Sequence, residues 1–193
     1  MHVLTVLDHP NKASFTAAAA RHFMDGARAA GHSVELADLN AEGFDPRWTQ
    51  ADVDEDMAAL PDIRAEQERI ARADAICLAF PLFWWGMPAM TKGWVDRVWT
   101  WGRAYDQLGE REVSLQRNRT GVLLVPAGGN SDDIAKEGYL DALETAWLKG
   151  TFGYFGLKPR RLEILYGATG SQKRREALLE RSYDIGRTLS EPD

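Results

Sequence analysis

Short apolar runs alternate along the chain with longer segments in which apolar residues recur at helical spacing. The runs are rich in aliphatic residues and end at turn-forming or charged residues, which is typical of buried strands. They lie at residues 2–7, 33–38, 75–80, 120–125 and 160–165. The spacing between them predicts a helix from Ser14 to about Ala30, others over 62–73, 88–98, 138–155 and 172–189, and a small helical piece around 52–59.

Strands that alternate with helices of this length favour parallel βαβ units over hairpins. Five such strands predict an α/β fold, namely a flavodoxin-like, doubly wound parallel sheet in the order 2-1-3-4-5 with helices on both faces. Residues 1–193 are expected to form one domain, because neither a repeat nor a low-complexity linker divides them. In such a sheet a ligand binds outside the carboxyl ends of the strands, between strands 1 and 3.

Composition narrows the class of protein. The chain has 23 Lys and Arg against 29 Asp and Glu, a net charge of −6, which argues against nucleic acid or an anionic membrane as a partner. Its one cysteine, Cys77, excludes disulfides and cysteine-based zinc sites, and the four histidines show no metal-ligand spacing. Neither a signal peptide nor a transmembrane apolar segment is recognisable, so we expect a cytoplasmic protein.

The loop after the first strand is a candidate anion site. It spans residues 8–16 and ends at a helix N-terminus, whose free N–H groups and dipole attract negative charge. Ser14 and Thr16 add hydroxyl donors, and His9 lies on the same loop. A capped helix behind an ordinary polar loop would explain these residues equally well.

Two further loops should meet the first at the same edge of the sheet. One carries Phe83, Trp84 and Trp85, flat rings that either pack under a neighbouring element or form a wall for a flat heterocycle. The other carries Gly128 and Gly129, which permit positive φ and a close approach of backbone N–H groups to a ligand. An anion cradle, an aromatic wall and backbone donors together describe a flavin site.

Several familiar motifs are missing. No GxGxxG follows the first strand, and neither GxxxxGK[ST] nor GxSxG occurs. The usual dinucleotide-binding fingerprint is therefore missing, and the classes P-loop NTPase and serine hydrolase are disfavoured. Cys77 lies in the middle of a strand, where a core position is expected and a reactive thiolate is not.

Four segments carry a more specific resemblance. They read HPNKASF at 9–15, DIRAEQERIARADAICLAFPLFWWGMPAMTKGWVDRVW at 62–99, PAGGN at 126–130 and GTFGYFGLK at 150–158. With them the sequence resembles the NAD(P)H:quinone oxidoreductase family of flavodoxin-fold flavoenzymes. The resemblance implies an enzyme that binds FAD, or alternatively FMN, and works as a homodimer with its active site at the interface. It also implies a ping-pong cycle that moves two electrons from NAD(P)H to a small-molecule quinone.

The resemblance further implies roles for single residues. The flavin phosphate loop would use His9, Ser14, Phe15 and Thr16, and Gln67 would contact the dinucleotide part of FAD. The flavin ring would be bound by Pro81, Leu82, Phe83, Trp84, Trp85, Ala127, Gly128 and Gly129. The implied substrate-binding residues are Trp84, Trp85, Tyr139 and Tyr105, the last supplied by the partner subunit, and the implied catalytic residues are Gly128, Tyr139 and Tyr105.

The sequence also departs from the family. The best-known branch has a tyrosine and a histidine after the Gly-Gly turn, whereas this chain has no histidine there and Tyr139 is the nearest candidate. We therefore hypothesise that no side chain is an indispensable general base. Arg187 and the basic run at 173–175 are the candidates for holding FAD adenine, and no residue assigns NADH or NADPH.

Two other functions remain open at this point. A flavodoxin-like electron carrier would use the same fold, although carriers use a shorter, glycine-rich phosphate loop than the one found here. A regulatory flavoprotein subunit of a potassium-efflux system is a role that some relatives combine with oxidoreductase activity. Azo dyes and nitroaromatics are alternative acceptors for the same chemistry.

Overall fold

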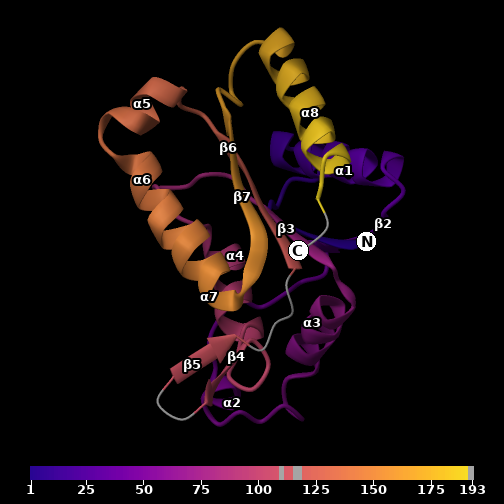
Figure 1. Cartoon of the computed structure of the whole chain (residues 1–193), viewed down its shortest axis with the longest axis vertical. Coiled ribbons are helices and arrows are strands. Elements are labelled where there is room, and N and C mark those ends of the chain that lie inside the picture. The colour runs from indigo at the N-terminus through magenta and orange to yellow at the C-terminus, as the bar shows by residue number, and fades with distance from the viewer. Residues whose placement is uncertain (109–110, 115–118, 191–193) are drawn as a thin grey trace.

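Five parallel strands form the central sheet (Figure 1). The computed structural model describes residues 1–108, 111–114 and 119–190. The order of the sheet is β2-β1-β3-β6-β7, and all neighbours are parallel. The order 2-1-3-4-5 predicted from the sequence is confirmed, with β6 and β7 as the fourth and fifth parallel strands. The strands are β1 His2–Leu7, β2 Ser33–Asp38, β3 Ala75–Ala79, β6 Arg119–Ala127 and β7 Leu157–Tyr166.

Helices cover both faces of the sheet, as predicted. Successive side chains of a strand point to opposite faces, so Cys77 of β3 packs with α1 and α8, whereas Leu78 packs with α3 and α4. The helices are α1 Phe15–Ala29, α2 Gln50–Val53, α3 Pro61–Arg72, α4 Ala89–Val98, α5 Ser131–Lys136, α6 Tyr139–Leu143, α7 Gly153–Phe155 and α8 Gln172–Arg187.

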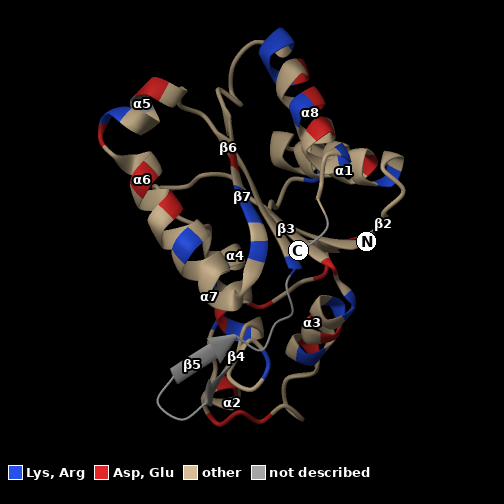
Figure 2. Ribbon diagram, in the orientation of Figure 1, with Lys and Arg blue, Asp and Glu red and all other residues tan. Residues whose placement is uncertain are grey.

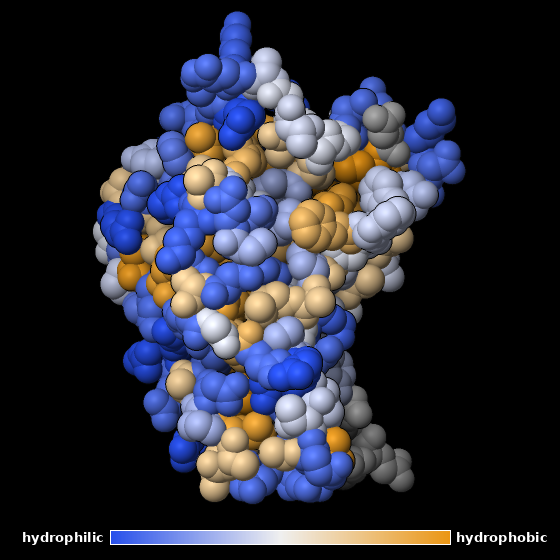
Figure 3. All heavy atoms as spheres, turned by 180° about the vertical axis from the view of Figure 1, so that it is seen from behind, coloured by the Kyte–Doolittle hydropathy of each residue, from blue (hydrophilic) through white to orange (hydrophobic). Residues whose placement is uncertain are grey.

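One face of the molecule is mainly polar. Hydrophilic residues cover most of the face in Figure 3, with apolar residues in small areas between them. Within the described ranges no helix combines the length and the apolar character needed to cross a membrane.

Two segments differ from the sequence-based prediction. Between residues 100 and 119, where the sequence pattern predicts neither helix nor strand, the structure contains the antiparallel pair β4 Tyr105–Leu108 and β5 Arg111–Ser114. These strands pair with each other and form a sheet separate from the main one. Neither contains a long apolar run by which the sequence pattern would reveal a strand. The small helix α2 begins at Gln50 and not near residue 52, because the Thr49 and Asp52 side chains form a capping box that fixes its first turn.

The predicted helix over 138–155 is present, but its middle is a π-helix. The stretch η1 Glu144–Phe152 joins α6 to α7 without a break. In its last turn the Thr151 hydroxyl donates to the Ala146 carbonyl at 3.1 Å, five residues earlier. Apolar spacing alone does not separate this wider turn from an α-helix, which explains why the sequence did not reveal it.

Other helix and strand ends also differ by a few residues from the sequence-based prediction. The fifth strand, predicted at 160–165, extends over Leu157–Tyr166. Helix α1 has its C-cap at Ala30, and Gly31 follows it with φ +85°. That left-handed conformation is the one that glycine adopts after a helix end.

Helices α1 and α8 pack backbone against backbone on one face. A Cβ atom at Gly26 would lie 1.9 Å from the Tyr183 carbonyl oxygen, and one at Gly186 would lie 1.9 Å from the Phe23 carbonyl oxygen. Only a residue without a side chain fits either contact. Since both helices follow parallel strands on the same face, their N-termini lie at the same edge of the sheet.

Replacing Gly26 by Ala should lower the free energy of unfolding by about 2 kcal/mol or more, because overpacking of a closed interface costs about 1–3 kcal/mol. Urea unfolding measures the change. The control Gly129→Ala places its Cβ 4.0 Å from Ile134 and should change stability by less than about 0.5 kcal/mol. Equal midpoints for the two variants would contradict the packing described.

Candidate active site

The loops after β1, β3 and β6 meet at one edge of the sheet. Their strands are direct neighbours in the sheet, so their carboxyl ends lie side by side. Backbone hydrogen bonds continue past the strands and join the loops. The Asp8 N–H donates to the Ala79 carbonyl at 2.9 Å, and the Leu82 N–H donates to the Pro126 carbonyl at 2.9 Å. The predicted convergence of the three loops is therefore confirmed.

The first loop is built by short-range side-chain hydrogen bonds. His9 Nδ1 accepts from the Asn11 N–H at 3.0 Å, and Asn11 Oδ1 accepts from the Ala13 N–H at 2.9 Å. Ser14 Oγ then accepts from the Ala17 N–H at 3.1 Å, which confirms Ser14 as the N-cap of α1. The N–H groups of the first helical turn precede the first intrahelical bond and face the sheet edge.

Asp8 is a buried anchor that the sequence analysis did not single out. Its carboxylate Oδ2 accepts from the Thr91 N–H at 2.9 Å and from the Thr91 hydroxyl at 2.7 Å. Its Oδ1 accepts from the Asn40 amide at 3.0 Å. Pro88, the N-cap residue of α4, makes no side-chain capping bond. Asp8, in the loop after β1, accepts from the first turn of α4 instead and so caps this helix. An Asp directly after a buried strand was the only signal in the sequence.

The aromatic loop closes in a two-residue turn. The Gly86 N–H donates to the Phe83 carbonyl at 2.8 Å, and the Phe83 N–H donates to the Gly86 carbonyl at 3.4 Å. Trp84 has φ +47° and Trp85 has φ +58°, which makes this a type I′ turn. Such positions favour Asn and Gly, and a bulky residue there costs about 1–3 kcal/mol. Strain of this kind is found at functional sites.

The rings of this turn differ in exposure. Trp84 is 98% exposed, Phe83 53% and Trp85 41%. Trp85 is partly covered because it stacks on Tyr139, with ring centroids 3.7 Å apart and planes at 11°. Tyr139, the first residue of α6, therefore lies beside the aromatic loop.

The third loop differs in conformation from the expectation. Positive φ was thought possible at Gly128 and Gly129, but neither has it. A Cβ at Gly128 would meet Thr169 at 3.6 Å, an ordinary contact. The left-handed glycine that shapes this region is Gly138, with φ +75°, at the N-cap of α6. Gly128 and Gly129 are both exposed at the edge, so their backbone stays accessible.

Basic residues gather where α8 begins at the same edge (Figure 2). Arg174 donates from Nε and Nη2 to the Tyr166 carbonyl at 3.2 and 3.0 Å. The guanidinium of Arg175 lies over the Phe15 ring, 5.5 Å from its centroid. Cations in a first helical turn oppose the helix dipole, so these arginines do not stabilise α8 through its dipole.

Two predicted site residues lie elsewhere in this chain. Gln67 is buried on α3 and donates to the Val98 carbonyl at 3.2 Å and to the Thr100 hydroxyl at 3.1 Å. These partners lie at the C-terminal end of α4, a helix of ten residues and about 15 Å whose first turn is held by Asp8. Gln67 therefore does not join the three loops within one chain.

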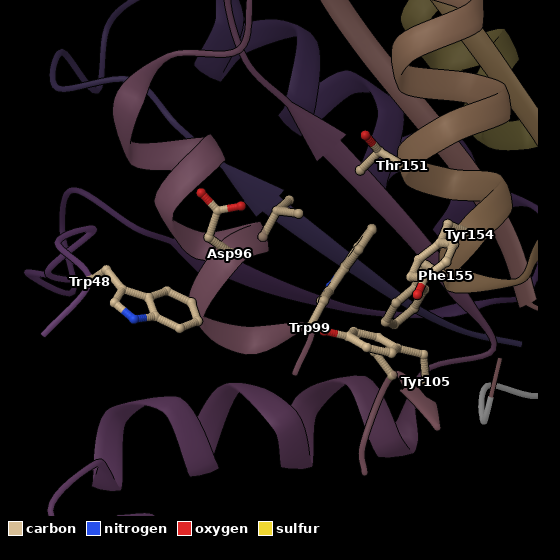
Figure 4. A pocket seen from close by; sticks show the side chains of 9 residues that line it. Trp48, Asp96, Trp99, Tyr105, Thr151, Tyr154 and Phe155 are labelled. Carbon is tan, nitrogen blue, oxygen red and sulfur yellow. The ribbon is translucent and has the colours of Figure 1, made fainter. Parts of the chain in front are cut away.

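Tyr105 lies in a separate aromatic pocket of about 320 Å³. Figure 4 shows its ring beside those of Trp99, Tyr154 and Phe155, with Trp48 across the pocket. Tyr105, like Gln67, therefore lies near the C-terminal end of α4 and not among the three loops. Cys77, as expected, is a core residue: it is fully buried, and burial raises the pKa of its thiol.

Comparison with known proteins agrees with this geometry. The family described as Flavodoxin-like fold matches residues 1–186. An NAD(P)H oxidoreductase of Haemophilus influenzae that is described as uncharacterized is 31% identical over 93% of this chain and 91% of its own length. The structure of an NAD(P)H:quinone oxidoreductase from Methanothermobacter marburgensis is 33% identical, with a TM-score of 0.90 over 98% of this chain and 99% of that one.

The chain belongs to the flavodoxin-like family of NAD(P)H:quinone oxidoreductases. The guinea pig NAD(P)H dehydrogenase [quinone] 1 (Cavia porcellus) is a more distant member, 28% identical over 85% of this chain and 68% of its own length. The three converging loops make the carboxyl edge of the sheet the candidate active site.

Relieving the strained turn should stabilise the fold. Trp84→Asn removes an almost fully exposed ring and introduces a residue that tolerates left-handed φ, so we expect a gain of about 1 kcal/mol, or a Tm rise of about 2–4 °C. Thermal unfolding of the flavin-free protein measures it. The control Trp48→Asn, at a position without positive φ, should bring no gain. A lower Tm for Trp84→Asn would contradict strain at this turn.

Proposed function

We propose that the protein binds a flavin at the carboxyl edge of β1, β3 and β6 and transfers two electrons from NAD(P)H to a quinone. The observation that carries the proposal is the convergence of a helix N-terminus, an exposed aromatic turn and an open Gly-Gly loop at that edge. Relatives named for the same activity support it.

The residues of the edge fit a flavin. The first turn of α1, capped by Ser14, offers unpaired N–H groups for a phosphate, and His9 and Thr16 lie beside it. The flat rings of the aromatic loop would otherwise leave a large apolar area exposed to water. FAD is favoured over FMN because its second phosphate would meet the basic first turn of α8, next to Phe15.

A bound flavin supplies the hydride chemistry, and the protein binds, orients and tunes it. Pro81, Leu82 and Phe83 would hold one side of the ring, and the backbone N–H groups of Gly128 and Gly129 would act as fixed dipoles for negative charge. NAD(P)H and quinone would use one slot in turn, which forces a ping-pong order. No side chain needs to act as an indispensable general base.

We further propose that the active protein is a homodimer. The chain exposes Trp48 and Tyr154 in the lining of the Tyr105 pocket, and the exposed Trp101 ring packs edge-on against Tyr105. Exposed aromatic groups of this kind mark interaction surfaces. A second copy packed there would place Tyr105 of one subunit next to the flavin of the other. The surface around Gln67, which lies near the same end of α4, would approach that flavin as well. The compartment that we expect for it is the cytoplasm.

Steady-state oxidation of NADH and NADPH with a small quinone tests the activity. We expect parallel lines in double-reciprocal plots at several quinone concentrations, because the two substrates share one slot. Reduction of bound flavin without turnover would instead indicate an electron carrier, and intersecting lines would contradict the shared slot. The preferred nicotinamide follows from the ratio of kcat/KM values.

Ser14 provides a test of the phosphate cradle with a matched control. Its Oγ accepts a capping bond, so its O–H is left to donate to a ligand. Ser14→Ala and the α2 cap variant Thr49→Ala should each cost about 1 kcal/mol of stability. Only Ser14→Ala should also weaken flavin binding, by about tenfold, in a fluorescence titration. Equal flavin affinities in both variants would argue against the cradle.

A further inference from the structure

The two tryptophans of the aromatic turn stand in different surroundings. One face of the Trp85 indole is covered by the Tyr139 ring, nearly parallel to it at a centroid distance of 3.7 Å. That spacing leaves no room for a third flat ring between them. Trp84, its neighbour in the turn, is 98% exposed and has no ring partner among the described residues.

The backbone explains why the two rings diverge. With φ +47° at Trp84 and +58° at Trp85, successive side chains of the turn leave it in different directions. The hydrogen bonds between Phe83 and Gly86 close the turn, but they act on its base and not on its tip. The stack on Tyr139 is thus the contact that holds the tip in place.

Tyr139 is itself placed by the backbone. It follows Gly138, whose φ of +75° starts α6 in a direction that a residue with a side chain would adopt only under strain. The contact that Tyr139 makes with the turn is through its ring. Its hydroxyl takes no part in the stack, although the family resemblance implied a catalytic role for this residue.

We propose that Tyr139 is a positioning residue that holds Trp85 by stacking, and that Trp84, whose ring is almost fully exposed, presents the main binding surface to the substrate. This assignment rests on the proposed function for its substrate, but the stack and its effect on the turn do not. Trp85 thus fixes the position of the turn, and Trp84 provides the main binding surface. The residue that matters at position 139 is an aromatic ring, not a phenol.

The full-length protein, with its flavin bound, tests the assignment through three variants. Tyr139→Leu should raise the KM for a small quinone about fivefold or more and change kcat less, because the Trp84 ring loses its fixed position. Tyr139→Phe keeps the ring and should restore KM to within about twofold of the unmodified protein. Trp84→Leu should raise KM at least as much as Tyr139→Leu, with no loss of Tm.

A loss of kcat in Tyr139→Phe as large as in Tyr139→Leu, with flavin bound, would show that the hydroxyl acts in catalysis and would overturn the proposal. An unchanged KM in Tyr139→Leu would overturn it as well. Both results presuppose quinone turnover, so a second measurement is needed that depends on no ligand.

A double-mutant cycle on the flavin-free protein provides it. Tyr139→Leu and Trp85→Leu should each lower Tm by about 2–4 °C and reduce the near-ultraviolet circular dichroism of the aromatic residues, because an aromatic pair is lost. The double variant should lose little more than either single variant. Additive losses of Tm in the double variant would show that the stack does not hold the turn. This result would count against the proposal even if the protein proved to have no flavin.

Discussion

The buried carboxylate of Asp8 is the contact on which the site depends. It joins the end of β1 to Thr91 in the first turn of α4 and to Asn40 after β2. An aspartate that is 5% exposed and has three donors is a strong anchor, since hydrogen bonds to a charged group exceed neutral ones. Because α4 follows the aromatic loop, this anchor holds one end of the loop, while the bond from the Leu82 N–H to the Pro126 carbonyl holds the other.

Between these two fixed ends the chain adopts a conformation that its residues disfavour. A turn with positive φ at two tryptophans would relax if its ends were free, so the anchors and the Trp85–Tyr139 stack keep it formed. The result is a rigid loop with one ring fully exposed at the edge of the sheet. A ring held out into water at this cost is expected where a flat ligand covers it, which links the strain to the proposed flavin site.

The strand order and the converging loops could be predicted because they follow from apolar runs, helix caps and the geometry of parallel sheets. The resemblance of residues 62–99 to known flavoenzymes added the chemistry. The rest depends on contacts that no local pattern reveals. Asp8 caps a helix 83 residues away, η1 replaces α-helical turns without changing the apolar spacing, and the β4–β5 pair is separate from the main sheet. The stack of Trp85 on Tyr139 joins a loop to the start of α6, so it too appears only in the folded chain.

The most direct test of the account is the identity of the compound that the purified protein releases on denaturation. Heat or acid treatment, followed by absorbance spectroscopy and chromatography of the supernatant, separates FAD from FMN. The account predicts about one flavin per chain, and FAD in particular if the basic turn of α8 holds a second phosphate. A colourless supernatant, together with no binding of added FAD or FMN by the refolded protein, would contradict a flavin site at the carboxyl edge of the sheet.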